Sequence, residues 1–267
     1  MGIGEDQTIS FGNGEAEWGL KRYSGAGATQ TAMTKANLLE DGLMLTHEVA
    51  IKARFQSSII SWYLINGRAY PWRQTTDAYK ILIAEILLRL TGAWKAQSVY
   101  ERIIGKYGTP ELLASASVHE ITDILRPLGL WNRSNTLINI GKQLSSTFGG
   151  SVPRTYSELV GIKGIGQYTA NAILCLAYKE RVPMVDMSVS RIFQRCLGFT
   201  TNKPAYADKE LWSLALDWLP ETNYREYNLG LLDLGALVCK YIRQSCVDCP
   251  VASCCQSRYR VTTHAKE

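Results

Sequence analysis

The chain has 267 residues, of which 46% are hydrophobic and 10% aromatic, so it can bury one large core or two modest ones. It lacks an apolar run of about 18 residues, and its first residues lack the pattern of a signal peptide. A net charge of +5 suits a nucleic-acid partner without requiring one. We therefore expect a soluble intracellular protein with no membrane partner.

The N-terminal segment, residues 1–45, is rich in Gly, Ala, Thr and Ser, which predicts a flexible tail. From Glu48 to Ile65 apolar residues recur at helical spacing, and Asn66-Gly67 ends that helix. Strand-like alternation is scarce in the rest of the chain, so the sequence predicts an all-α protein. Further helices are expected at about 78–90, 93–107, 109–115, 117–126, 132–147, 155–160, 167–179, 187–197, 207–218 and 224–241.

Glu85 interrupts the apolar stretch 81–88, which otherwise has the composition of a buried helix. Burying a carboxylate is costly unless something compensates for the lost water. One explanation is a salt bridge with Arg89, which lies four residues later on the same helix face. The other is a carboxyl group of raised pKa that lines a pocket, and the sequence leaves both open.

Two corners between predicted helices carry large side chains that can lie exposed. The first contains Arg89 and Leu90, and the second contains Leu130 and Trp131. Enzymes that flip a base out of duplex DNA fill the gap with an inserted side chain, so these residues are candidates for DNA contact. Core packing is the alternative for each of them.

In the segment 161–166, Gly164 and Gly166 lie two positions apart, directly before a helix that starts at Gln167. Such a turn lets the bare backbone approach a phosphate, and the unpaired N–H groups of the following helix point the same way. Lys163 adds a cation. A plain helix–helix connection is the alternative, but the flanking helical stretches favour a phosphate clamp.

Asp186 ends an apolar stretch and precedes another predicted helix, where aspartate commonly serves as N-cap. The helix dipole favours the anionic form of a carboxyl group in this position. An anion there can also stabilise positive charge that develops on a sugar, or activate a water molecule. The capping and catalytic interpretations are compatible.

Five of the seven cysteines fall between residues 239 and 255, whereas Cys175 and Cys196 lie alone in apolar stretches. In a reducing compartment, thiols this close together indicate a metal site rather than disulfides. Structural zinc usually takes two short cysteine pairs, while irregular close spacing suits a [4Fe–4S] cluster. The spacing by itself leaves both metals open.

Taken together, residues from about 51 to 255 resemble the helix-hairpin-helix DNA glycosylases of the endonuclease III and MutY superfamily. The resemblance implies two α-helical domains, a six-helix barrel and an iron–sulfur cluster domain, with the DNA cleft between them. The matching motifs, in chain order, are Pro71-Trp72-Arg73, Glu85 in its apolar helix, Leu128-Gly129-Leu130, the hairpin through Gly166, Thr169-Ala170, Val185-Asp186, Asn228 with Asp233-Leu234-Gly235, and C-x6-C-x2-C-x5-C.

The resemblance also implies domain boundaries, a cofactor and a partner. The barrel would span 71–181, with the helix-hairpin-helix motif at about 155–179, and the cluster domain would combine 46–70 with 182–260. The partner would be double-stranded DNA with a mismatch or damaged base, bound by a monomer in the cytoplasm or at the nucleoid. A [4Fe–4S] cluster would be held by Cys239, Cys246, Cys249 and Cys255, with Cys254 as a spare neighbour.

Tyr168 distinguishes branches of the superfamily. Bifunctional members have a lysine here that forms a Schiff base with the sugar and leads to strand cleavage, whereas a phenol cannot form that imine. With Tyr168, the chain most resembles the Mig-type T·G mismatch glycosylases, which remove thymine or uracil opposite guanine without cutting the strand. Two further motifs share this resemblance: Glu85-Ile86-Leu87-Leu88-Arg89 and Tyr227-Asn228-Leu229-Gly230-Leu231. Catalysis would fall to Asp186, Glu85 and Tyr168.

Two other functions stay open. An adenine glycosylase of the MutY group shares Glu85, Asp186 and the cysteines, and a catalytically idle DNA-binding module would keep only the clamp and cluster. The clamp would consist of Lys163, Gly164, Gly166 and Gln167. Lys163 departs from the family pattern, which has proline at this position.

Overall fold

The computed structural model describes residues 35–89, 92–242 and 244–257, with side chains from residue 48 onward. All regular secondary structure in these ranges is helical, which confirms the all-α prediction. The chain divides into two compact units, Met1–Met44 and Leu45–Glu267. Within the described ranges, no helix combines the length and apolar character needed to cross a membrane.

Helix α1, Lys35–Asn66, begins well before Glu48, where the apolar periodicity starts. The residues after Lys35 include leucines and Glu40 and contain no proline, so they are compatible with a helix despite their weak periodicity. The part of the predicted tail before Lys35 lies outside the described residues.

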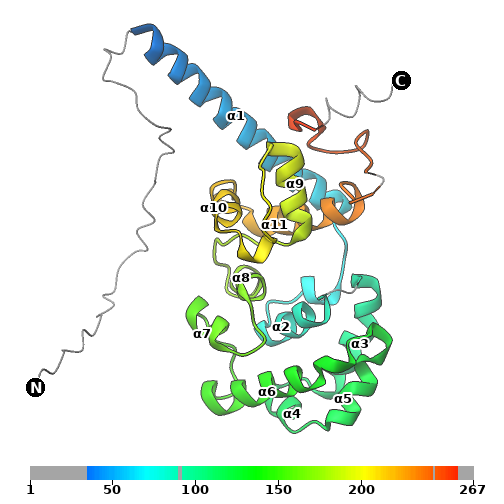
Figure 1. The fold of residues 1–267 in the computed structure, drawn as a ribbon. Helices are drawn as coiled ribbons and strands as arrows, with labels where there is room; N and C mark the ends of the chain where they lie inside the picture. Colours follow the sequence, from blue (N-terminus) through cyan, green and yellow to red (C-terminus); the bar gives the residue numbers. More distant parts are fainter. Residues whose placement is uncertain (1–34, 90–91, 243, 258–267) are drawn as a thin grey trace, which may run out of the picture. The chain divides into compact units, whose positions relative to one another are not determined.

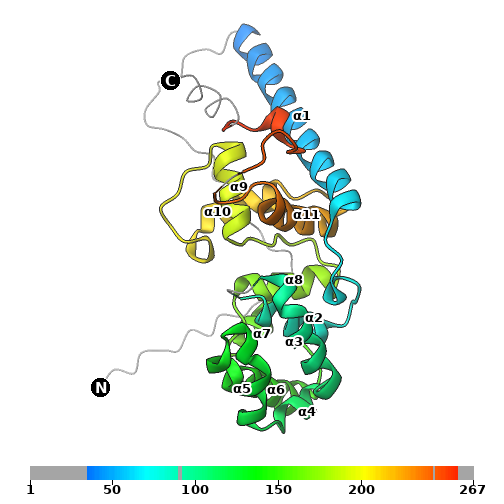
Figure 2. The same cartoon turned by 90° about the vertical axis from the view of Figure 1, so that its right-hand side faces the viewer.

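A first hydrophobic core joins the helices between residues 72 and 184. Helix α4 packs on α6, α2 packs on α8, and these helices lie together in both views (Figures 1 and 2). The elements are η1 (Pro71–Arg73), α2 (Ala78–Leu87), α3 (Ala93–Lys106), α4 (Pro110–Ala114), α5 (Val118–Leu125), η2 (Arg126–Leu128), η3 (Trp131–Arg133), α6 (Ser134–Phe148), α7 (Tyr156–Gly161) and α8 (Gln167–Leu176).

A second core joins Phe55 and Ile59 of α1 to the helices that follow Val185. Helix α9 packs against α11, and Phe55 meets Trp218 edge-on with ring centroids 5.4 Å apart. Both cores belong to the compact unit Leu45–Glu267. Its remaining elements are α9 (Met187–Leu197), η4 (Ala205–Ala207), α10 (Lys209–Asp217), α11 (Tyr224–Leu237) and η5 (Ala252–Cys254).

Short polar residues define where these helices begin. Asp77 accepts hydrogen bonds from the first amides of α2, and Asp208 does the same for α10. Thr155 accepts from the Glu158 amide and donates to the Glu158 carboxylate at the start of α7, an arrangement close to a capping box. Such caps satisfy backbone donors that have no partner inside the helix.

Candidate active site

One cavity of about 430 Å³ brings the three predicted catalytic residues together: α2 contributes Glu85, α8 contributes Tyr168, and the start of α9 contributes Asp186. Aromatic, aliphatic and charged groups complete its wall, including Arg68, Tyr70, Trp72, Arg73, Leu88, Met187, Leu229 and Leu232. An apolar cavity with a few convergent polar groups is the usual form of a ligand site.

Glu85 is buried, with 5% of its surface exposed, in the middle of α2. Burial, with a smaller contribution from the Asp186 charge, raises its pKa to about 7, although the charges of Arg73 and Arg89 oppose the shift. The ion pairs of the described residues include none between Glu85 and Arg89. Of the two explanations the sequence leaves open, the pocket-lining carboxyl group of raised pKa is therefore the one that the structure supports.

Arg89 is directed to the hairpin instead. Its Nη2 donates to the Gly164 carbonyl at 2.8 Å and to Thr169 Oγ1 at 3.0 Å. These contacts fasten the end of α2 to the turn before α8. Arg89 thus holds the hairpin in place beside the cavity, and its predicted contact with DNA stays a prediction.

Tyr168 lies in the first turn of α8, and its hydroxyl donates a hydrogen bond to Glu85. Burial raises the pKa of the phenol well above its usual value, and the charge of Glu85 adds to that shift. The hydroxyl therefore keeps its proton at neutral pH and acts as a donor. Its bond to Glu85 favours the ionised carboxylate and partly offsets the effect of burial.

Asp186 is the N-cap of α9: its Oδ1 accepts from the Ser188 amide at 2.7 Å and the Val189 amide at 2.8 Å. Burial raises the pKa of its carboxyl group, and the two amides act in the opposite direction. Gly235 of α11 allows this close approach, because a Cβ at that position would lie 2.5 Å from the Ser188 Cβ. The sequence-based expectation of an N-cap is met.

Two buried asparagines fix the backbone that leads into Asp186. Asn228 of α11 accepts from the Met184 amide at 3.0 Å and donates to the Val182 carbonyl at 3.0 Å. Asn171 of α8 donates to the Pro183 carbonyl at 2.8 Å. An extended segment without a strand partner is thereby held from both sides.

A buried ion-pair network lies behind the cavity wall, and sequence reasoning assigned it no role in the site. Asp233, fully buried in α11, accepts from Arg73 Nη1 and Nη2 at 2.7 and 2.8 Å and from Arg68 Nε at 2.7 Å. Burial opposes ionisation, but the hydrogen bonds and charge of Arg73 lower the pKa of Asp233. The partners lie 160 or more positions apart in the sequence, so the pairing becomes visible only in the folded chain.

The glycine hairpin joins α7 to α8. Gly164 has φ +107°, and a Cβ there would lie 2.8 Å from Thr136 Cγ2, so both backbone conformation and space require glycine. Gly166 has extended backbone and nothing within 4 Å of an added Cβ, which leaves the approach to the first amides of α8 open. The turn therefore requires glycine at position 164, and glycine at position 166 keeps the first amides of α8 accessible.

Lys163 is exposed on this turn, and its backbone N–H donates to Gln143 Oε1 at 3.1 Å. Proline, the residue expected here from the family pattern, has no N–H to give. The hydrogen bond to α6 therefore supplies rigidity that the missing proline ring would otherwise provide.

The candidate insertion residues differ in exposure. Leu130 is 6% exposed and belongs to the first core, whereas Trp131 is 61% exposed at the start of η3. In this conformation packing accounts for Leu130, whereas the Trp131 side chain is available to a partner. Leu90 lies outside the described residues.

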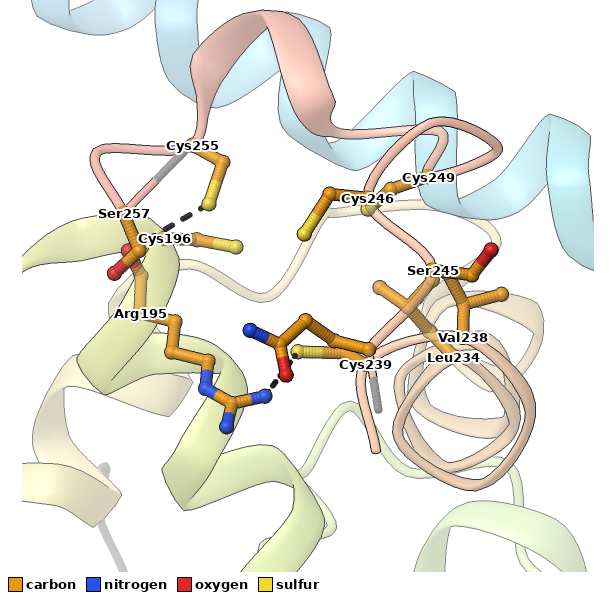
Figure 3. Close-up of a pocket in the computed structure, with 11 residues that line it drawn as sticks. Arg195, Cys196, Leu234, Val238, Cys239, Ser245, Cys246, Cys249, Cys255 and Ser257 are labelled. Atoms are coloured by element: carbon orange, nitrogen blue, oxygen red, sulfur yellow. Dashed lines mark hydrogen bonds between the residues drawn. The ribbon is translucent and has the colours of Figure 1, made fainter. Parts of the chain in front are cut away.

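The four predicted metal ligands, Cys239, Cys246, Cys249 and Cys255, line a second cavity of about 210 Å³ (Figure 3). Arg195 Nη1 lies 3.5 Å from Cys239 Sγ at its edge. In the described part of the chain, no three His, Cys, Asp or Glu side chains converge as ligands of one ion. Thiols around an open space fit a multi-iron cluster better than zinc, whose ligands meet at a single centre.

Comparison with known proteins identifies the family. Residues 83–215 match the HhH-GPD superfamily base excision DNA repair protein family. The chain is 33% identical over 210 residues to thymine/uracil-DNA glycosylase of Methanothermobacter thermautotrophicus, covering 78% of this chain and 95% of that protein. This chain belongs to the HhH-GPD superfamily. As a member it is a base excision repair DNA glycosylase, a hydrolase of N-glycosyl bonds, which confirms the predicted reaction class.

Structural and further sequence relatives agree with this assignment. The fold superimposes on a thermostable thymine-DNA glycosylase with a TM-score of 0.75 at 32% identity, covering 80% of this chain and 99% of that one. Human adenine DNA glycosylase is 30% identical over 227 residues, which cover 81% of this chain but 42% of the human protein. The predicted resemblance and fold are therefore confirmed.

Proposed function

We propose that this HhH-GPD glycosylase removes thymine or uracil mispaired with guanine in duplex DNA, acting as a monomer and leaving the strand intact. The observation that carries the proposal is Tyr168, which stands beside Glu85 and Asp186 in one cavity. The relatives named for thymine or uracil release support the choice of base.

Tyr168 determines the product. A strand-cleaving glycosylase needs an amine that attacks C1′ and forms an imine, and a phenol supplies no such nitrogen. The raised pKa of Tyr168 also makes it a poor oxygen nucleophile. Water therefore completes the reaction, and the product is an abasic site.

The two carboxyl groups divide the remaining work. Asp186, whose carboxylate caps α9, would stabilise the positive charge that develops on the sugar as the base departs. Glu85, with a pKa of about 7, suits proton transfer near neutral pH. We assign it as the general base that takes a proton from the attacking water.

The cavity has room for a flipped pyrimidine, since about 430 Å³ lies within the range of small-molecule sites. Gly164, Gly166, Gln167 and the Lys163 side chain would clamp the DNA backbone next to it. Trp131 would contact the strand from the other loop. DNA positioned in this way presents one flipped nucleotide to the carboxylates.

Cys239, Cys246, Cys249 and Cys255 would hold a [4Fe–4S] cluster. Bound there, such a cluster would cross-link the segment after α11 to the last described residues of the chain. The mechanism above uses only protein side chains and water.

Adenine release opposite guanine or 8-oxoguanine is the second candidate. The 30% identity to human adenine DNA glycosylase over 227 residues favours it. It predicts the same two carboxyl groups in the same cavity, so the nature of the released base separates the two functions. A non-catalytic DNA-binding module would bind these duplexes and release nothing.

The test is a set of duplexes containing T·G, U·G, A·G, A·8-oxoguanine or thymine glycol, each incubated with the full chain and analysed with and without alkali. Breaks that appear only after alkali, with T·G or U·G, support the proposal. Preferential adenine release would replace it with the second candidate, and breaks without alkali would contradict monofunctional action. An Asp186→Asn protein serves as the inactive control.

A further inference from the structure

Five thiols, rather than four, surround the proposed cluster cavity. Besides the four predicted ligands, Cys196 of α9 lines the same space, and Figure 3 shows its side chain directed into it. The sequence places Cys196 alone in an apolar stretch, more than 40 positions before the others, so only the fold reveals the fifth thiol.

Cys196 and Cys255 are neighbours because the end of the described chain is fastened to the end of α9. The Gln256 amide donates to the Cys196 carbonyl at 3.1 Å, and the Ser257 amide donates to the Arg195 carbonyl at 2.9 Å. The two thiols, Cys196 and Cys255, also share a hydrogen bond. A sulfur atom at either position thus faces the same side of the cavity.

Cys254, the spare cysteine expected from the sequence, is placed differently. Its Sγ donates to the Val251 carbonyl at 3.4 Å, and it is absent from the residues that line the cavity. Sequence adjacency to Cys255 does not bring it to the cluster. The fold therefore separates two extra thiols, one inside the cavity and one outside it.

We propose that Cys196 is a reserve cluster ligand that takes the place of Cys255. This inference rests on the [4Fe–4S] assignment made above and not on the base that the enzyme removes. In the exchange an iron–sulfur bond to Cys255 breaks and one to Cys196 forms. The Cys196 thiol releases its proton as the Cys255 sulfur gains one, and no electron is transferred.

Burial of Cys196 at 3% exposure would also suit a plain packing role, but packing does not require sulfur. Serine has nearly the same size, and its oxygen is a far poorer ligand of an iron–sulfur cluster than a thiolate sulfur. Cysteine-to-serine variants therefore separate ligation from packing.

The test measures iron and sulfide per chain, and absorbance at about 400 nm, in full-length Cys255→Ser, Cys255→Ser/Cys196→Ser and Cys255→Ser/Cys254→Ser proteins. We expect the first and third to keep a cluster and the second to lose it, with at least about tenfold less iron. Equal iron in the two double variants, or a folded Cys255→Ser protein without iron, would overturn the proposal.

A second comparison does not depend on whether Cys255→Ser folds. In an otherwise unchanged chain, Cys196→Ser should lose iron to a chelator several times faster than Cys254→Ser, which should match the parent protein. Equal rates in all three would count against a reserve ligand. An iron-free parent protein prepared without oxygen would instead overturn the cluster assignment itself, whatever its glycosylase activity.

Discussion

Glu85 and Asp233 are both carboxyl groups buried inside helices, 5% and 0% exposed, yet their environments act in opposite directions. Burial raises the pKa of Glu85 to about 7, with Arg73 and Arg89 only partly opposing it. At Asp233 hydrogen bonds and charges from Arg73 and Arg68 outweigh burial, so its pKa is lowered. Burial alone therefore does not identify a reactive acid. What distinguishes Glu85 is that fewer hydrogen-bond donors and positive charges compensate its buried carboxyl group.

The difference has opposite consequences for stability. Asp233 contributes stability at pH values above its usual pKa of 3.8, and that contribution is lost as the pH falls through the lowered pKa. Glu85 binds its proton more tightly in the folded state, so it costs stability as the pH rises from 4.5 toward 7. The fold tolerates Glu85 at a cost, which indicates a role in chemistry.

Asp186→Asn should have the largest effect on activity. Losing the negative charge beside the sugar should lower single-turnover base release by roughly a thousandfold, while asparagine can still cap α9. Affinity for a T·G duplex should change little, as measured by fluorescence anisotropy. A variant with activity near that of the parent would remove Asp186 from the mechanism.

Asp233→Asn should have the largest effect on stability. Removing one partner leaves the buried charge of Arg73 uncompensated, which costs about 3–5 kcal/mol in the free energy of unfolding. Denaturant melts at pH 7 and at a pH well below 3.8 should show a smaller difference from the parent at the lower pH, because the contribution of Asp233 is lost only as the pH falls through its lowered pKa. A loss below about 1 kcal/mol would mean that the ion pair is not needed.

Glu85→Gln should separate activity from stability. Base release should fall about a hundredfold, and the rise in rate with pH up to about 7 in the parent should flatten. At pH 8 the variant should be more stable, by at most about 3 kcal/mol at 1.36 kcal/mol per pKa unit. A Glu85→Gln protein less stable than the parent at pH 8 would mean that the Glu85 carboxylate stabilises the fold, as the Asp233 carboxylate does.

Lys163 should give the smallest effect, and it needs two variants. Lys163→Pro removes the amide that bonds to Gln143 and should cost about 1 kcal/mol, while Lys163→Ala keeps that amide. Both remove a cation, so both should weaken DNA binding to a similar extent in salt titrations. Equal stability of the two would show that the rigidity of the proline ring offsets the lost contact with Gln143.

Much of the site could be anticipated where local chemistry determines the outcome. A charged residue in the apolar run around Glu85, an aspartate before a helix at 186, and glycines in a tight turn each carry a local signal. The helices were predictable for the same reason, although α11 ends at Leu237, where the chain turns into the cysteine segment.

Contacts between distant positions were not predictable in this way. The sequence around Asp233 does not indicate that two arginines bind it, and the sequence around Cys196 does not indicate that four more thiols lie nearby. Each contact depends on how whole helices pack. Leu130 and Trp131 illustrate the same limit at short range. Leu130 is buried and Trp131 is exposed, and this difference depends on how the loop packs rather than on the type of either side chain.

The central claim is that a phenol, and not an amine, faces the sugar beside Glu85 and Asp186. Borohydride trapping tests it most directly: the full chain is incubated with a T·G duplex and sodium borohydride, and covalent protein–DNA adducts are resolved on a denaturing gel. We predict free protein and an abasic strand with no adduct. A trapped adduct would reveal an imine, and its disappearance in Lys163→Ala would identify the amine that contradicts the assignment of Tyr168.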